Sequence, residues 1–159
     1  MMGRGASGVP VPEAPLDFAA PPRPDSPNWW MALPPDEARG QPRCTAHALP
    51  GLGREEAWRA LLGVAGAVPR CFALAMFPER RQAQWVVRSA LFGFPDVVVG
   101  EAVDGGVRLH SRSLMGWSDL GVNRRRVEAW LAAPHRAGGG RGSAARPLPP
   151  PQPPRGGGA

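Results

Sequence analysis

The 159-residue sequence contains no lysine, isoleucine or tyrosine. A strongly GC-biased coding sequence accounts for all three absences, so the formal net charge of +6 is carried by arginine. Residues 44–133 hold eleven arginines and eight acidic residues, whereas the last 26 residues hold four arginines and no acid. The excess charge therefore belongs mostly to the C-terminal tail, and we expect no nucleic-acid partner.

Long apolar runs are also missing. Nothing approaches the 18 to 20 or so consecutive apolar residues that a membrane-spanning helix needs. The first residues, MMGRGASGVPVPEAP, contain one arginine but no apolar core of a secretory signal. These features predict a chain without a transmembrane segment and favour a cytoplasmic location.

Cysteine is scarce. Cys44 and Cys71 are too few for a disulfide scaffold, and the sequence leaves open whether they pair or remain thiols. His47 follows Cys44 at a spacing of three, but a structural zinc site needs four ligands in recognisable clusters. We therefore predict no metal and no cofactor.

Proline and glycine are abundant, at 21 residues each, and they mark the two ends of the chain. Residues 1–43 are interpreted as a Pro-rich leader, ordered in part around Trp29 and Trp30. Prolines on both sides of that pair argue against a helix or a central strand. The tryptophans could fold back as a flap over the domain or stack on a ligand. Residues 134–159 are interpreted as a disordered tail that begins where Pro134 ends the last helix.

The part between these ends, residues 44–133, is interpreted as a single α+β domain. Apolar residues at helical spacing predict a helix over 54–67, and a second over 120–133 that Ser118 or Asp119 caps. Alternating residues predict strands over 70–77, 82–89, 96–103 and 107–114, with a bulge at Gly100 and a tight turn at 104–106. The predicted fold is a four-stranded antiparallel meander with two helices on one face, in the order helix, four strands, helix.

The last strand has two chemically different faces. Ser111 and Ser113 follow Val107 and Leu109 on one face, and the opposite face carries Arg108, His110 and Arg112. In the helix that follows, Asn123 occupies the apolar stripe. A buried amide without partners costs about 1 to 3 kcal/mol. We therefore expect Asn123 to bond backbone groups of the turn over 115–118 or of the neighbouring strand.

Two segments, RSALFGFPD and HSRSLMGWSDLGVNRRRVEAWL, resemble the signature of the domain-of-unknown-function 1499 family of bacteria and plastids. The resemblance extends from about Cys44 to Leu131, and Trp117 stands where the family usually has tyrosine. It implies a bacterial or plastid type of protein with no settled activity. The matching positions are Arg88, Ser89, Phe92, Phe94, Pro95, Asp96, Ser111, Arg112, Ser113, Gly116, Ser118, Asp119, Gly121, Asn123, Arg124 and Arg126.

A non-catalytic binding or scaffolding module is the function these features favour. The candidate ligand is an anionic small molecule or a lipid head group on a cationic strand face. The candidate binding residues are Arg88, Arg108, His110 and Arg112.

Two alternatives remain. The first is a purely structural or protein-interaction domain whose polar residues pin the last helix to the sheet. That candidate network comprises Asp96, Ser111, Ser113, Ser118, Asp119, Asn123 and Arg126. The second is a hydrolase using serine, histidine and aspartate, which is disfavoured because neighbours on a strand, such as His110 and Ser111, point to opposite faces.

Overall fold

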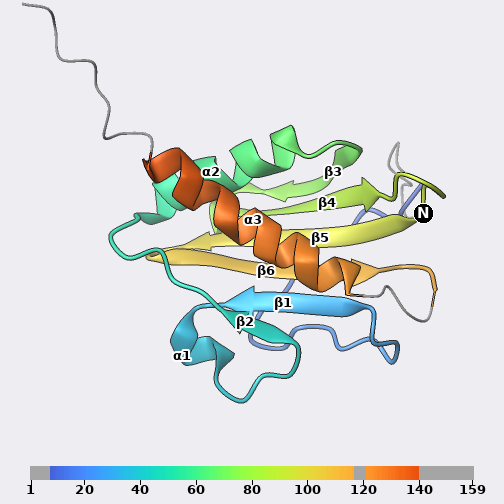
Figure 1. Ribbon diagram of the computed structural model, residues 1–159, viewed down its shortest axis with the longest axis horizontal. Coiled ribbons are helices and arrows are strands. Elements are labelled where there is room, and N and C mark those ends of the chain that lie inside the picture. The colour runs from blue at the N-terminus through green and yellow to red at the C-terminus, as the bar shows by residue number, and fades with distance from the viewer. Residues whose placement is uncertain (1–7, 117–120, 140–159) are drawn as a thin grey trace, which may run out of the picture.

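A computed structural model of the chain describes residues 8–116 and 121–139. Figure 1 shows one sheet with two long helices on the same face. In chain order the elements are β1 (Trp29–Leu33), α1 (Pro35–Ala38), β2 (Cys44–Ala46), α2 (Arg54–Ala67), β3 (Cys71–Phe77), the short 3-10 helix η1 (Pro78–Arg80), β4 (Gln82–Arg88), β5 (Pro95–Val103), β6 (Gly106–Ser113) and α3 (Val122–Gly139).

The sheet has six strands in the order β2-β1-β6-β5-β4-β3. Strands β3 to β6 form consecutive antiparallel pairs, β1 is antiparallel to β6, and β2 is parallel to β1. The prediction of a four-stranded antiparallel meander with two helices was therefore wrong. The sheet is mixed, and the described residues include a third helix, α1, between β1 and β2.

The strand count was wrong because residues 1–43, which were assigned to a leader, contain the strand β1. β1 lies in the interior of the sheet, with Trp29 to Ala32 paired to Arg112 to Leu109 of β6. Pro27 and Pro34 flank this strand instead of interrupting it, so neither removes a donor from the ladder. The six residues between the two prolines leave room for this five-residue strand, and the argument against a central strand there was incorrect.

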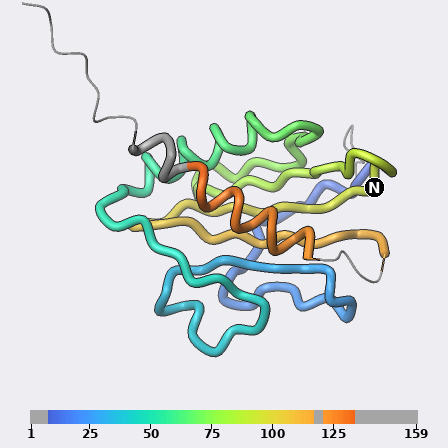
Figure 2. Tube along the Cα trace, viewed as in Figure 1, coloured from blue at the N-terminus to red at the C-terminus, as the bar shows by residue number. Residues whose placement is uncertain are grey.

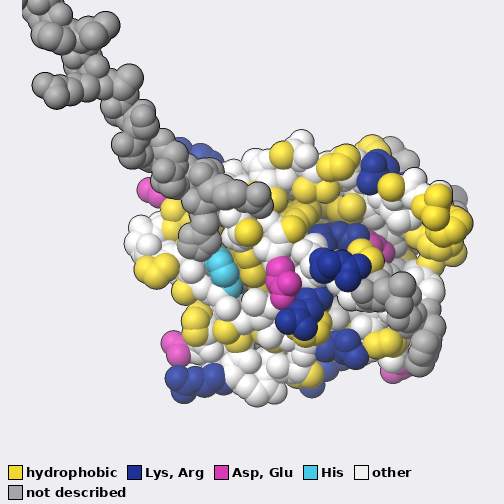
Figure 3. Space-filling view, in the orientation of Figure 1, with side chains coloured by type: hydrophobic (Ala, Val, Ile, Leu, Met, Phe, Trp, Pro, Cys, Tyr) yellow, Lys and Arg dark blue, Asp and Glu magenta, His cyan; other side chains and the backbone are white. Residues whose placement is uncertain are grey.

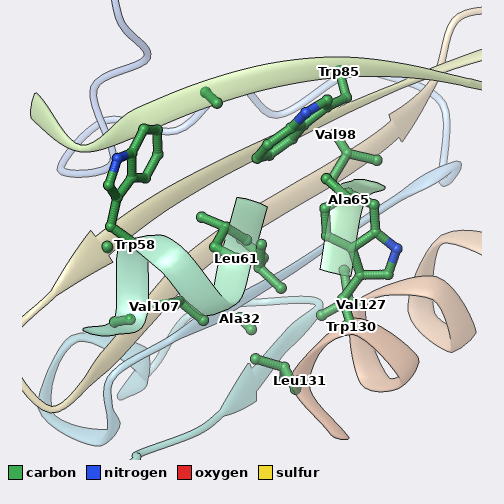
Figure 4. Packing of buried hydrophobic residues seen from close by; sticks show 14 of the residues in the cluster. Ala32, Trp58, Leu61, Ala65, Trp85, Val98, Val107, Val127, Trp130 and Leu131 are labelled. Atoms are coloured by element: carbon green, nitrogen blue, oxygen red, sulfur yellow. The ribbon is translucent and has the colours of Figure 1, made fainter. Parts of the chain in front are cut away.

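Helices α2 and α3 form one layer against the sheet, and Figure 4 shows the core between them. Leu61 of α2 and Trp130 of α3 are both buried in this core. The rings of Trp85 and Trp130 meet edge to face, with centroids 5.4 Å apart and an interplanar angle of 65°. α2 has the bounds predicted from its periodicity, whereas α3 passes through Pro134 and ends at Gly139.

The other face of the sheet is covered by the N-terminal segment, residues 8–28, which Figure 2 shows crossing behind the strands. Val9 and Phe18 are buried there in a second apolar cluster. The backbone of Leu16 forms two hydrogen bonds with the buried Gln82 side chain: its N–H donates to Oε1 at 2.7 Å, and its carbonyl accepts from Nε2 at 2.9 Å. A segment without regular structure thus serves as the second covering layer.

The two cysteines lie on opposite edges of the sheet, Cys44 on β2 and Cys71 on β3, and both are free thiols. Five strand spacings of about 4.8 Å separate those edges by about 24 Å. A disulfide requires Cα atoms within about 7 Å. The question that the sequence left open is therefore resolved, because the two thiols of one chain cannot pair.

Gly100 is not a bulge. It pairs regularly with Ala83 and Leu109, and the register shift of the sheet falls between Ala73 and Ala75 of β3. A Cβ atom at Gly100 would lie 2.8 Å from Cδ2 of Leu61 and 3.1 Å from the Trp85 ring. The missing side chain is what lets α2 approach β5.

We predict that Gly100→Ala lowers the free energy of unfolding by about 1 to 3 kcal/mol, because overpacking forces Leu61 or the Trp85 ring to move. The matched control is Gly63→Ala on the exposed side of α2, where no atom lies within 4 Å of the added Cβ. That change should raise stability by about 0.5 to 1 kcal/mol. Urea denaturation measures both. Equal effects of the two substitutions would contradict the close approach at Gly100.

Candidate functional site

A buried polar network joins the first turn of α3 to the sheet, and Asn123 is at its centre. The Asn123 Oδ1 accepts from the Ser111 hydroxyl at 2.5 Å and from Arg126 Nη1 at 3.0 Å. Its Nδ2 donates to the Ser113 hydroxyl at 2.8 Å and to the Asn28 carbonyl at 3.0 Å. The amide thus uses two donor and two acceptor sites on three segments of the chain.

Arg126 extends the network to β5. Its Nη2 lies 2.6 Å from Asp96 Oδ2, and its Nη1 also donates to the Ser111 hydroxyl at 3.0 Å. The two side chains of this ion pair are only 12% and 10% exposed. Removing one partner would leave an uncompensated buried charge, so this pair fixes the position of α3 over the sheet.

Asn28 connects the start of β1 to the same network, and sequence reasoning missed it. Its carbonyl accepts from the Ser113 backbone N–H at 2.9 Å as well as from Asn123, and its Nδ2 donates to the Gly116 carbonyl at 2.7 Å. The side chain is 1% exposed, yet its Oδ1 has no hydrogen-bond partner among the described residues. The available signal was an asparagine directly before the tryptophan pair, in a chain that has one other asparagine.

Of the residues predicted for a structural network, the structure brings together Asp96, Ser111, Ser113, Asn123 and Arg126. Asn123 was expected to bond backbone groups of the turn over 115–118 or of the neighbouring strand. On β6 it bonds the side-chain hydroxyls of Ser111 and Ser113 instead, and its one backbone partner is the Asn28 carbonyl before β1. Ser118 and Asp119 lie outside the described residues, and so does the predicted helix cap.

The four predicted binding residues are on the face that the N-terminal segment covers. Arg108 pairs with Glu37 at 2.6 Å and with the buried Glu101 at 3.4 Å. Arg88 Nη1 donates to the Gly93 carbonyl at 2.7 Å, and burial lowers the pKa of Arg112. The assignment of Arg88, Arg108, His110 and Arg112 to an anion site stays a prediction.

His110 is fully buried and stacks on Trp29, with ring centroids 5.7 Å apart. Its Nε2 lies 3.0 Å from the Pro22 carbonyl, which fits an N–H donating to that oxygen. Burial lowers the pKa of His110 to about 4, so the ring is neutral near pH 7. Ser111 points to the opposite face, toward Asn123, so the histidine and the serine do not form a catalytic pair.

A cleft of about 300 Å³ opens beside the network, at the start of β1. It exists because β2 pairs only with Met31 to Leu33, so the first two residues of β1 extend beyond the end of β2. Its lining comprises Pro27, Asn28, Trp29, Trp30, Arg43, Gly121 and Arg124, and we call it the Trp–Arg cleft.

Cations and indole rings alternate in this cleft. The Arg124 guanidinium lies over the Trp30 ring, 4.9 Å from its centroid, and that of Arg43 lies 5.9 Å from the Trp29 centroid. Within residues 8–116 and 121–139, the lining residues include no acid. In Figure 3, arginine side chains gather over the N-terminal half of α3, the part of the helix next to the cleft. The cleft is thus a cationic, aromatic-walled surface.

The fold and this site define the class as an α+β domain with a six-stranded mixed sheet. The chain belongs to the family described as protein of unknown function (DUF1499), which it matches over residues 20–133. The match begins before β1, earlier than the resemblance to the signature segments indicated. No curated protein and no solved structure matches the chain.

Two general features of the described residues bear on the kind of site. They include no helix with the length and apolar character needed to cross a bilayer. Nor do these residues bring three or more histidine, cysteine or acidic side chains together in an arrangement able to hold a metal ion.

We predict that Asn123→Ala lowers the free energy of unfolding by about 2 to 3 kcal/mol, because buried groups of Ser111, Ser113 and Asn28 lose their partner. For a domain of this size the melting temperature should fall by about 8 °C or more. The control is Val122→Ala, one position earlier, where the side chain is 38% exposed. This change should alter the melting temperature little. Differential scanning calorimetry measures both. Similar small shifts in the two variants would show that the network does not hold α3.

Proposed function

We propose that the protein is a non-catalytic binding module for a small anionic group, carried by a metabolite or a lipid head group, in the Trp–Arg cleft. The observation that carries the proposal is the pair of guanidinium groups over Trp29 and Trp30, in a cleft whose lining shows no acid among the residues that the structure describes. Arginine on an aromatic ring combines orientation with charge, and its N–H groups match carboxylate or phosphate oxygens.

The two arginines keep enough freedom to accept a ligand. Arg124 also pairs with Glu128 at 2.9 Å, but the side chains are 58% and 45% exposed. Exposed pairs of this kind contribute less than about 1 kcal/mol, so an entering anion can compete with the glutamate. Arg43 is exposed, and its φ of +50° is a backbone conformation that arginine seldom adopts.

Two further groups define the chemistry of the ligand. Helix α3 starts at Val122, next to the lining residue Gly121, so the positive end of its dipole lies beside the cleft. Asn28 is also a lining residue, and the part of the chain that the structure describes supplies no donor to its buried Oδ1. A ligand that carries a hydroxyl or amine next to its anionic group matches both features. A phosphate monoester of a polyol has this chemistry.

The competing proposal is a purely structural or protein-interaction domain. Its support is the network around Asn123, in which the amide already has four partners from the protein itself. A domain of that kind would hold the cleft arginines only as solvated surface charges. The two proposals therefore differ in whether a soluble anion saturates the cleft.

We predict that glycerol 3-phosphate changes the tryptophan fluorescence saturably, since Trp29 and Trp30 line the site, and that inorganic phosphate does so more weakly. Glycerol is the uncharged control ligand. Losing one charged hydrogen-bond partner costs about 1.5 to 3 kcal/mol, so Arg43→Ala and Arg124→Ala should each raise Kd about tenfold or more.

Arg59→Ala, an exposed arginine of α2, is the control variant and should leave Kd unchanged. Absence of saturable binding in the wild-type protein would overturn the proposed function. So would equal affinities of the wild type and the two cleft variants.

A further inference from the structure

One end of the sheet carries the most exposed apolar side chains of the described residues. Leu91 is 80% exposed, Phe92 68% and Phe94 43%, all on the connection between β4 and β5. Leu114 and Met115 follow β6 at the same end and are also exposed, and the Leu114 N–H donates to the Pro95 carbonyl at 3.2 Å. We call these five residues the apolar tip. Figure 3 shows apolar side chains gathered at this end.

The connection that exposes them is a closed, hydrogen-bonded loop. The Ser89 N–H donates to the Phe94 carbonyl at 3.0 Å, and the Gly93 N–H donates to the Ser89 carbonyl at 3.1 Å. The Ser89 hydroxyl accepts from the Phe94 N–H at 3.0 Å, and Arg88 donates to the Gly93 carbonyl. The rings of Phe92 and Phe94 stack with centroids 5.3 Å apart. The loop therefore presents its apolar side chains from a fixed backbone.

These bonds pair backbone groups of Ser89, Gly93 and Phe94. They lower the cost of moving the loop into a medium of low polarity, because each unpaired N–H or carbonyl costs several kcal/mol in hydrocarbon. The loop from Ser89 to Phe94 contains no charged side chain. Soluble surfaces seldom keep several large apolar side chains together unless they meet a protein or a membrane. The loop chemistry thus fits insertion among lipid head groups.

The charges around the tip distinguish a bilayer from other occupants. The nearest acid along β5, Asp96, is buried in its ion pair with Arg126. Arg43 and Arg124 lie at the same end, where β1 and α3 start, and Figure 3 shows arginines between α3 and the tip. An apolar tip beside cationic side chains complements an anionic surface with an apolar interior. A second copy of this end would bring cations against cations.

We infer that the apolar tip docks this end of the protein on an anionic lipid bilayer, with Leu91, Phe92 and Phe94 entering the head-group region. The inference rests on the loop and goes beyond the proposed binding function, although docking would also bring the Trp–Arg cleft close to lipid head groups. It does not require the cleft to bind any ligand.

The test is co-sedimentation of the whole chain with phosphatidylcholine vesicles, with and without phosphatidylglycerol. We expect binding only to the anionic vesicles, weakening as salt is added. Leu91→Ser and Phe92→Ser should each reduce partitioning about tenfold or more, because each removes an apolar side chain from the lipid. Met76→Ser changes a 45% exposed residue on the edge strand β3, away from the tip, and should have no effect.

The following results would contradict docking on an anionic bilayer. Equal partitioning of wild type and Phe92→Ser would overturn the inference, as would binding to both kinds of vesicle or to neither. Sedimentation velocity without lipid tests a second copy as the occupant: a wild-type dimer that Phe92→Ser makes monomeric would overturn docking on lipid. Phe92→Ser should retain the fluorescence response to glycerol 3-phosphate. Loss of vesicle binding can therefore be told apart from loss of ligand binding in the Trp–Arg cleft.

Discussion

The arrangement of the molecule depends on the desolvated amide of Asn123. Its two donor and two acceptor sites are satisfied by Ser111 and Ser113 of β6, by Arg126 of α3 and by the Asn28 carbonyl. These partners meet only when β1 lies against β6 and the first turn of α3 crosses both strands. Since buried polar groups without partners cost more than the bonds themselves contribute, the amide specifies this packing more than it adds net stability.

The hydrogen-bond network around Asn123 also shapes the Trp–Arg cleft, the surface proposed to bind an anion. With β1 held at its start by Asn28, the two tryptophans that follow point to opposite faces of the sheet. Trp29 stacks on His110 beneath the N-terminal segment, whereas Trp30 packs against the core on the helix side and receives Arg124. The Trp–Arg cleft is the space at this edge of β1 that the shorter β2 leaves uncovered. Asn28 belongs both to the buried network and to the lining of this cleft.

How far the sequence predicts this structure depends on how local each signal is. The helix over 54–67 and the four strands of the meander follow from periodicity within a dozen residues, and the alternate faces of β6 follow from its pattern. The strand at Trp29 to Leu33 does not, because its pairing with β6 is set by residues about 80 positions away. The N-terminal covering layer has no periodic signal at all. For the candidate site, Asn123 was predictable as a buried amide, but its partner Asn28 and the cleft arginine Arg43 depend on where β1 lies.

We conclude that β1 and Asn28 at its start belong to the cooperative core. Native-state hydrogen exchange at the Ser113 amide, which donates to the Asn28 carbonyl at 2.9 Å, tests it directly. The reference is the Val98 amide in the middle of β5. We expect the Ser113 and Val98 amides to exchange only through global unfolding, with the same free energy of opening. An opening free energy for Ser113 several kcal/mol below that for Val98 would contradict it, because β1 would then detach from an otherwise folded domain.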